Sequence, residues 1–381
     1  MQSRPRNLVT VINQQRVVVT SHKNKKKGTG QGSPILRKGS GFIMKKTLLA
    51  LTIAAASTSA FANVGLENAK PTFEFDPMHK EQFSVSGAIG VGGYYDTKTK
   101  AMYDDWATAL TLAVSYQNNR VLGYFETDFE LNWTTDDSKT FNKATNKGIK
   151  NDFGTDVDKA WLGFDTGVGV LSYGWENDTA LDKVDGAGDF TYEFGSSAGD
   201  ASDQYNVVKF QGATSGFAYG VSYFETDDDH DAADKGVNGY VGFESEIVNV
   251  YGGYETRDDA DYQVYSLSGN SKIGELDLGI NFWINEGADD VAKNTTNLET
   301  VGYYLSAGYP VTEQLTLAAG YNANSTTEDG EADNDVSRIN VAAMYTLNDR
   351  VDMGIDILQD IDAGNGKDEE TYVFAAAFYS F

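Results

Sequence analysis

From about residue 83 onward, apolar and polar residues alternate with a period of two, in runs separated by turns or polar loops. The clearest run is 276–285, where Leu, Leu, Ile, Phe and Ile occupy every second position. Successive side chains of a β-strand point to opposite faces, so this run predicts a strand with one apolar and one polar face. About 9–11 tilted residues cross the hydrocarbon core of a membrane, which is the length of this run.

Sixteen such runs follow one another to the end of the chain. They are 83–95, 106–116, 121–133, 157–165, 168–176, 205–211, 217–225, 237–244, 247–256, 261–272, 276–285, 301–309, 315–322, 339–347, 351–360 and 370–381. The last run carries no charge after Glu370 and ends on an aromatic residue, which suits a strand that closes a wall against lipid. Bacterial single-chain membrane barrels have an even strand number. We therefore expect an all-β fold, a transmembrane antiparallel up-and-down β-barrel of about 16 strands.

The connections between the predicted strands alternate between short and long. Links of one to five residues alternate with longer, mostly polar links, of which 134–156 and 177–204 are the longest. Short turns on one rim and longer loops on the other are typical of a transmembrane barrel. A soluble β-sandwich, the main alternative, has no reason to keep this alternation.

Composition agrees with a β-rich exported protein. Of 381 residues, 12% are aromatic, 40 are Gly and only 5 are Pro, a balance that strands tolerate. The absence of Cys excludes disulfides and cysteine-ligated metal sites. Residues 1–62 hold 11 Lys and Arg and no acidic residue, which leaves 19 basic against 56 acidic side chains beyond them. So negative a chain repels nucleic acid and attracts cations.

The N-terminal residues divide the chain into three parts. In 44–62, a basic start, an apolar stretch and the small residues Ala60 and Ala62 predict a secretory signal peptide. Residues 1–43 are basic and lack periodicity, so we interpret them as an unstructured extension upstream of the true start; a nucleic-acid-binding tail is the rival interpretation. Residues 63–381 form the predicted barrel, with 73–75 expected to pair beside the last strand.

The loop at 177–204 is the longest interior connection and is strongly acidic, with Lys183 as its one basic residue. The strand before it ends in Tyr173-Gly174, and the loop contains Glu193-Phe194-Gly195. With these motifs the sequence resembles the general porins of Gram-negative bacteria, in which the third loop folds into the lumen and narrows the pore. The resemblance places these loop carboxylates at the constriction: Asp178, Asp182, Asp185, Asp189 and Glu193.

The same resemblance implies further properties. It implies a homotrimeric pore in the bacterial outer membrane, with lipid and lipopolysaccharide around it and no cofactor. It also implies that Tyr379 and Phe381 belong to a terminal signal read by the barrel-assembly machinery. One departure concerns the wall opposite the loop, where the family usually has an arginine cluster. Here Lys209 and Arg338 are the remaining candidates for wall cations, so we expect a weak transverse field.

The predicted wall adds more negative charge. In strand 121–133 the Phe residues suit lipid, which places Glu126, Asp128 and Glu130 on the lumen side. A charge at the middle of the bilayer costs roughly 2–4 kcal/mol, so these carboxylates are not lipid contacts. Together with the loop carboxylates they predict a water-filled, cation-preferring channel for passive diffusion of small hydrophilic solutes.

Two other functions remain open at this point. A substrate-specific channel, for example for oligosaccharides, is possible because four aromatic residues on predicted lumen positions offer a stacking track: Tyr240, Tyr251, Trp283 and Tyr304. A barrel hydrolase needs a His beside a Ser or Asp pair. Only His79 and His230 follow the predicted signal peptide, so we expect no catalytic residues and no metal site.

Overall fold

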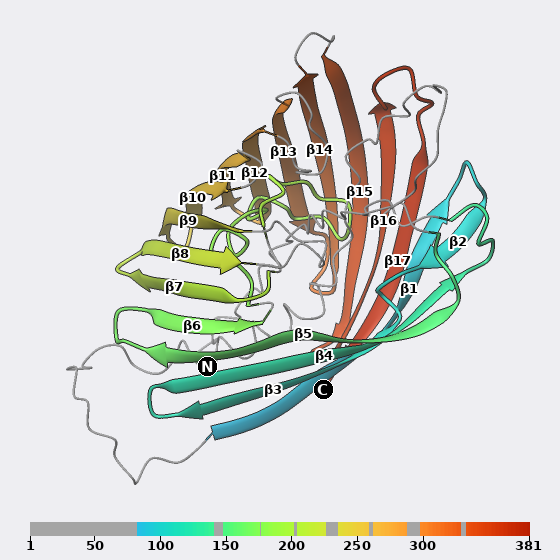
Figure 1. Cartoon of the computed structure of the whole chain (residues 1–381). Helices are drawn as coiled ribbons and strands as arrows, with labels where there is room; N and C mark the ends of the chain where they lie inside the picture. Colours follow the sequence, from blue (N-terminus) through green and yellow to red (C-terminus); the bar gives the residue numbers. More distant parts are fainter. Residues whose placement is uncertain are drawn as a thin grey trace, which may run out of the picture.

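The computed structural model describes residues 82–140, 148–175, 177–201, 204–225, 235–258, 262–287, 298–328 and 333–381. The predicted extension, the signal peptide, the strand segment at 73–75 and both candidate histidines lie outside these residues. Within them the strands form one continuous curved wall (Figure 1). No helix that is long and apolar enough to cross a membrane is found in this described part.

The wall consists of one long run of strands. Their bounds are β1 Gln82–Asp96, β2 Ala101–Asp104, β3 Ala109–Asn118, β4 Val121–Thr134, β5 Asp152–Asp165, β6 Val170–Trp175, β7 Val207–Thr214, β8 Phe217–Glu225, β9 Lys235–Glu244, β10 Val248–Arg257, β11 Gln263–Ile273, β12 Leu276–Glu286, β13 Leu298–Pro310, β14 Leu315–Glu328, β15 Asn334–Asn348, β16 Val351–Asp362 and β17 Thr371–Ser380.

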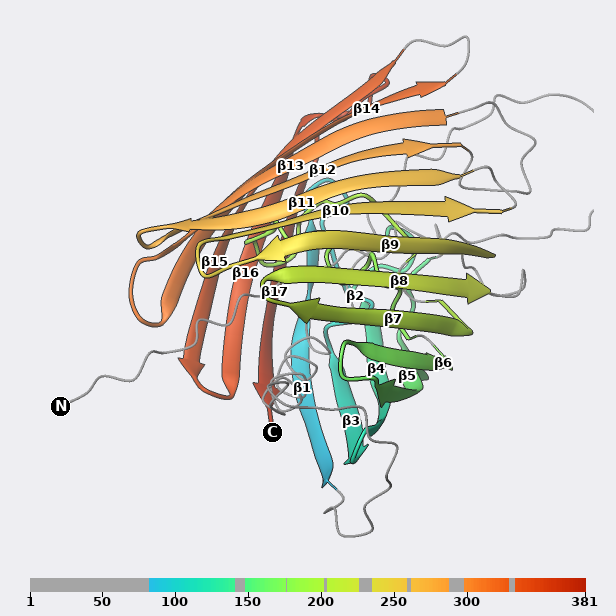
Figure 2. The same ribbon diagram turned by 90° about the vertical axis from the view of Figure 1, so that its left-hand side faces the viewer.

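The strands close into a barrel with sixteen positions around its circumference, here called staves, because two of the seventeen described strands share one position. From β3 to β17 each strand pairs antiparallel with the next, and β17 pairs back onto β1, from Ala88 opposite Ser380 to Asp96 opposite Tyr372. The short β2 pairs with β1 and β4, so β2 and β3 together form one stave that is interrupted at 105–108. Figure 2 shows the same wall from the side. The predicted sixteen-stranded, up-and-down barrel is confirmed.

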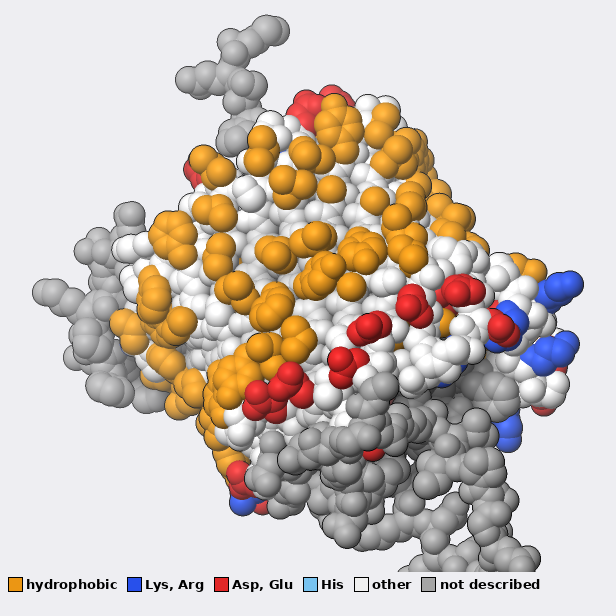
Figure 3. Space-filling model, turned by 90° about the horizontal axis from the view of Figure 1, so that it is seen from above, with side chains coloured by type: hydrophobic (Ala, Val, Ile, Leu, Met, Phe, Trp, Pro, Cys, Tyr) orange, Lys and Arg blue, Asp and Glu red, His pale blue; other side chains and the backbone are white. Residues whose placement is uncertain are grey.

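Alternation along each strand separates an apolar outer face from a polar inner face. In β12, Ile280 and Phe282 are exposed, whereas Asn281 between them is buried. The same pattern repeats around the wall, and Figure 3 shows hydrophobic side chains spread over one face with carboxylates along an edge. An exposed apolar area this extensive marks a surface that lipid covers.

Several predicted bounds were wrong at the rim with the long loops. Strand β14 continues to Glu328 and β15 begins at Asn334, so the connection between the predicted strands 315–322 and 339–347 is much shorter than expected. Strand β5 begins at Asp152, five residues before the predicted strand 157–165. These strand ends are rich in polar residues and lack a clear alternation, yet their backbone groups continue the pairing with the neighbouring strands.

The predicted start of strand 106–116 was also wrong, because β3 begins only at Ala109. The Asp104 carboxylate accepts hydrogen bonds from the backbone N–H groups of Trp106, Ala107 and Thr108, at 3.3, 2.9 and 2.6 Å. A side chain that satisfies three successive amides replaces the ladder locally, since those groups then need no strand partner.

The chain end completes the seam between β17 and β1. Phe381 and Gly87 exchange two backbone hydrogen bonds, at 2.9 and 3.1 Å. The Phe381 ring lies over Gly87 and stacks on Tyr379, with 6.4 Å between ring centroids. Both aromatic side chains are therefore on the outer face, where assembly factors can reach them; their role as an assembly signal stays a prediction.

We predict that Gly87→Ala destabilises the closed barrel. A Cβ atom at Gly87 would lie 2.5 Å from the Phe381 ring and 2.6 Å from the Thr111 carbonyl oxygen. Overpacking of this kind costs about 1–3 kcal/mol. The urea midpoint of folded protein in detergent should fall, measured by the gel mobility of unheated samples. Gly252→Ala is the matched control, because no atom lies within 4 Å of the new Cβ there; equal midpoints for both variants would contradict the prediction.

Candidate functional site

The connection between β6 and β7, here called the inner segment (177–201 and 204–206), lies against the inner face of the wall. The Gly188 N–H donates to the Asn281 amide oxygen at 2.8 Å, and the Phe190 N–H donates to the Ser306 hydroxyl at 3.1 Å. Neighbouring residues of these wall side chains, such as Ile280, are exposed on the outer face. The bonded side chains therefore point inward, and the segment runs inside the ring of strands (Figure 1).

The first limb of the inner segment follows β8 to β11. The N–H groups of Ala180 and Leu181 donate to Ser222 and Asn238 at 2.9 and 3.3 Å. Leu181 occupies the space above Gly253 in β10, where any Cβ atom would overlap it. Inward-facing glycines thus leave room for the segment to approach the wall closely.

The tip of the inner segment reaches the opposite side of the barrel. One carboxylate oxygen of Asp356 in β16 accepts the N–H groups of three successive residues, Tyr192, Glu193 and Phe194, at 3.2, 2.9 and 3.0 Å. Glu193 in turn accepts the Tyr94 hydroxyl of β1 at 2.6 Å. The tip is therefore fixed on both sides of the β17–β1 seam.

The return limb is fixed by polar side chains of β10 and β12. The Asn281 and Asn285 amides donate to the carbonyl oxygens of Ser196 and Ala198 at 2.9 and 2.6 Å. The Ala201 N–H donates to Glu255 at 2.8 Å, and Glu255 pairs with Arg257 at 2.6 Å. Sequence reasoning missed this buried ion pair, although acid and base two residues apart on one strand face are its visible signal.

The predicted constriction carboxylates all lie on the inner segment, but they differ in exposure. Asp182, Asp185, Asp189 and Glu193 expose only 3, 1, 2 and 6% of their surface. Asp185, for example, accepts from the Ala198 N–H and the Ser266 hydroxyl at 3.2 and 3.1 Å. Asp185, Asp189 and Glu193 thus hold the segment to itself and to the wall. Asp178 is more exposed, and it pairs with Lys159 of β5 at 2.7 Å.

Burial changes the protonation of the segment. Loss of water, together with the nearby Asp178 charge, raises the pKa of Asp182 to about 8. Burial also raises the pKa values of Asp185 and Asp200. Removal of a carboxylate from water disfavours its charged form. The inner segment therefore carries less negative charge near neutral pH than its number of acidic residues indicates.

The wall carboxylates of β4 all point inward. Glu126, Asp128 and Glu130 are buried on the inner face. The hydroxyl of Tyr124 contacts Glu126, and the hydroxyl of Thr111 contacts Asp128. These three acids thus share one side of the lumen.

A β-bulge in β5 adds two charges that sequence reasoning missed. The register of β4 and β5 shifts between Glu126 and Thr127, which leaves Asp158 as an extra residue in β5. Both Asp158 and the adjacent Lys159 are buried as a result. A period-two pattern assigns neighbouring residues to opposite faces, so only the structure reveals that both lie on the inner side.

The two predicted wall cations are not brought together. The Lys209 ammonium donates to the Asp178 carbonyl oxygen at 2.6 Å, close to Lys159. Arg338 pairs instead with Asp360 across β15 and β16, at 2.8 Å. Each cation is thus held by its own local acceptor.

The proposed stacking track lies beneath the inner segment. Four aromatic side chains pack there with Ala180, Leu181 and Val184: Tyr240, Tyr251, Trp283 and Tyr304. The Tyr304 hydroxyl also contacts Thr191 of the segment, at 2.9 Å. Their rings are covered by protein and do not present open faces to a sugar.

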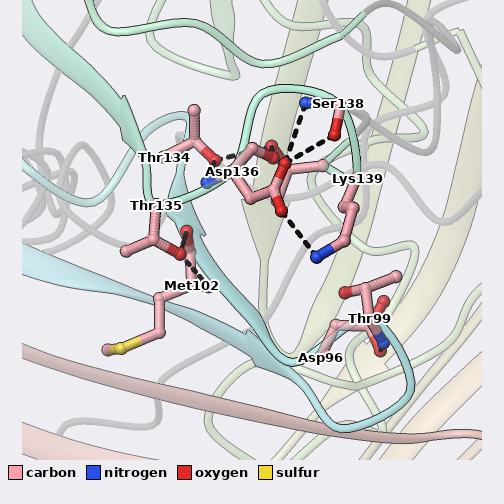
Figure 4. Close-up of polar contacts among 9 residues, drawn as sticks. Asp96, Thr99, Met102, Thr134, Thr135, Asp136, Ser138 and Lys139 are labelled. Carbon is pink, nitrogen blue, oxygen red and sulfur yellow. Dashed lines mark hydrogen bonds and ion pairs between the residues drawn. The ribbon is translucent and has the colours of Figure 1, made fainter.

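Among the described residues, no group of three or more His, Cys, Asp or Glu side chains could hold a metal ion. A polar cavity of about 490 Å³ lies at the rim with the long loops. Its lining residues are Thr134, Thr135, Asp136, Asp137, Lys150 and Asn151. Asp136 there accepts from Ser138 and pairs with Lys139, both at 2.6 Å (Figure 4).

Comparison with known proteins agrees with this geometry. The sequence model of a family described as Gram-negative porin matches residues 47–365. No protein of curated function matches the chain in sequence.

Solved structures with the same fold include OmpT, an outer membrane protein of Vibrio cholerae. Its loop L8 deletion mutant is 17% identical, with a TM-score of 0.61 over 79% of this chain and 99% of that chain. Its in-vitro folded trimer form is 16% identical, with a TM-score of 0.59 over the same 79% and 99%. An anion-selective porin from Comamonas acidovorans is 13% identical, with a TM-score of 0.57 over 79% of this chain and 100% of that chain.

We predict that Asp356→Ala releases the tip of the inner segment. Hydrogen bonds to a charged group contribute about 1.5–3 kcal/mol each, and three backbone N–H groups lose their acceptor together. Single-channel recordings in planar bilayers should show a larger and more fluctuating conductance. Asp352→Ala is the matched control. This carboxylate of the same strand accepts a hydrogen bond from the Thr346 hydroxyl, and among the described residues it accepts none from the inner segment. An unchanged Asp356→Ala channel would contradict the anchoring role.

We predict that stability falls as the pH rises from about 4 to about 8, because the raised pKa of Asp182 makes the folded protein bind more protons than the unfolded chain in this range. Asp182→Asn keeps a neutral side chain and should flatten this slope of the urea midpoint. The control is Asp136→Asn, at a half-buried carboxyl whose pKa is lowered by hydrogen bonds from Lys139 and Ser138. A slope that persists in Asp182→Asn would disprove the assignment.

Proposed function

The chain belongs to the Gram-negative porin family, and we propose that this outer-membrane channel for passive diffusion prefers cations. The observation that carries the proposal is the set of carboxylates on the inner face of β4, namely Glu126, Asp128 and Glu130. A ring or row of acidic side chains in a narrow, water-filled lumen raises the local concentration of cations.

The balance of charges around the lumen supports the same direction. The inner cations Lys159 and Arg257 are each paired with a carboxylate, at 2.7 and 2.6 Å. Arg338 is likewise paired with Asp360. Paired cations contribute little net field, whereas the acidic side chains outnumber them. An anion-selective porin has the same fold, so selectivity must come from the side chains of each chain and not from the barrel.

Passive diffusion fits the site better than a substrate-specific track or a hydrolase. Tyr240, Tyr251, Trp283 and Tyr304 are packed under the inner segment, which removes the main support for sugar stacking. The inner carboxylates are engaged in hydrogen bonds that fix a loop, an arrangement that serves a pore of fixed shape. We therefore propose a channel without enzymatic activity or cofactor.

We also infer the surroundings in which the channel works. The structure of the similar Vibrio protein in its trimer form supports a homotrimer. The exposed apolar band fits outer-membrane lipid and lipopolysaccharide, and the terminal Tyr379 and Phe381 fit recognition by the barrel-assembly machinery. The signal peptide at 44–62 would direct export and be removed from the mature chain. A lumen of this negative charge gives nucleic acid no binding surface.

The test is the reversal potential of purified channels in a potassium chloride gradient. We expect a reversal potential whose sign shows that potassium permeates more readily than chloride. The magnitude of this potential should be smaller for the double variant Asp128→Asn, Glu130→Gln. Asp258→Asn, an exposed carboxylate at the rim with the long loops, is the matched control and should leave the value unchanged. Preference for chloride by the unmodified protein would overturn the proposal.

A further inference from the structure

One charged side chain of the inner segment is exposed although its neighbours in the segment are buried. Lys183 is exposed, whereas Leu181, Val184 and Asp185 around it are buried against the wall. These residues form a tight turn, in which the N–H groups of Val184 and Asp185 both donate to the Leu181 carbonyl oxygen at 2.9 Å. The turn directs three side chains to the wall and leaves Lys183 facing the lumen.

Lys183 also differs from the other inner lysines in its contacts. Lys159 and Lys209 each donate to Asp178, at 2.7 and 2.6 Å. Across the described ranges of the chain, Lys183 forms no side-chain hydrogen bond or ion pair. Its ammonium group is therefore available to solutes and ions in the lumen.

The surroundings of Lys183 place it near the rim with the short turns. Its electrostatic neighbours include Lys209 and Glu244, an inward-facing residue at the end of β9 that also accepts the Tyr251 hydroxyl at 3.0 Å. Burial of the turn lowers the pKa of Lys183, and Glu244 acts in the opposite direction. Contact with water keeps the charged form hydrated, which favours the ammonium ion.

We propose that Lys183 is a selectivity-determining residue of this channel, whose exposed ammonium group weakens the preference for cations and attracts permeating anions. The inference rests on the proposed function, because it assumes that ions pass through the lumen. The loop sequence is acidic and by itself suggests that the segment presents negative charge to the lumen. In the structure, however, four of the five predicted constriction carboxylates are buried while the single lysine of the segment is exposed.

The size of the effect follows from Coulomb attraction in water. A unit charge within about 5–10 Å of a permeating ion changes its local concentration roughly two- to fourfold at the dielectric constant of water. The charge depletes cations by the same factor by which it enriches anions, so replacement of Lys183 by a neutral residue should change the cation-to-anion permeability ratio by up to about the square of this factor. Salt screening makes the change smaller, and reversal of the charge should make it larger.

The first experiment compares Lys183→Gln and Lys183→Glu with the unmodified channel by reversal potential. We expect the preference for potassium to increase in the order Lys, Gln, Glu. Lys235→Gln is the matched control, because this lysine loses the same charge at the rim with the long loops, where it faces Asp258 at 3.6 Å. No graded change at Lys183, or an equal change at Lys235, would overturn the inference.

The second experiment uses the absence of cysteine in the chain. Lys183→Cys introduces a single thiol, which methanethiosulfonate reagents modify only if it is exposed. An anionic sulfonatoethyl reagent should raise the preference for potassium, and a cationic aminoethyl reagent should restore the value of the unmodified channel. A folded channel whose thiol does not react would overturn the inference.

The experiments distinguish a failure of the proposed cation preference from a failure of the proposed role of Lys183. If the unmodified channel prefers chloride but the Lys183 series keeps its order, the assignment of Lys183 stands and the proposed cation preference does not. If the unmodified channel prefers potassium and the Lys183 series is flat, only the inference about Lys183 is wrong.

Discussion

Pairing of the backbone in hydrocarbon is the constraint on which this structure depends. Lipid offers no partner for an N–H or C=O group, so every stave must be bonded on both sides and the sheet must close. Hydrogen bonds between β17 and β1, extended by Phe381 and Gly87, provide that closure. Once the sheet is closed, one face of each strand meets lipid and the other meets the lumen, which imposes the two-residue alternation along the chain.

The same closure creates an interior whose chemistry differs from that of a soluble core. Inward side chains include Asn, Ser, Asp and Tyr, and many of them bond to the inner segment, as Asn281 and Asp356 do. Inward glycines such as Gly253 remove the side chain where the segment touches the wall. The wall thus specifies the position of a connection that has no regular secondary structure of its own.

The strands could be predicted from the sequence because lipid makes their pattern strict, and β8 at Phe217–Glu225 was predicted to the residue. The arrangement of the interior could not be predicted from the sequence, and the physical reason differs from one part of the interior to another. The bulge that turns both Asp158 and Lys159 inward breaks the period on which the prediction relied. Burial of Asp182 and Tyr240 depends on where the inner segment rests, and the sequence of a loop does not contain its neighbours across the barrel.

Asp356 and Tyr94, which fix the tip of the inner segment, belong to strands near the two ends of the chain, whereas the segment itself comes from the middle. The segment therefore connects opposite sides of the barrel through hydrogen bonds, which should stabilise the barrel against flattening. Its final position also requires both ends of the polypeptide, so the interior is organised only after the circumference has been completed.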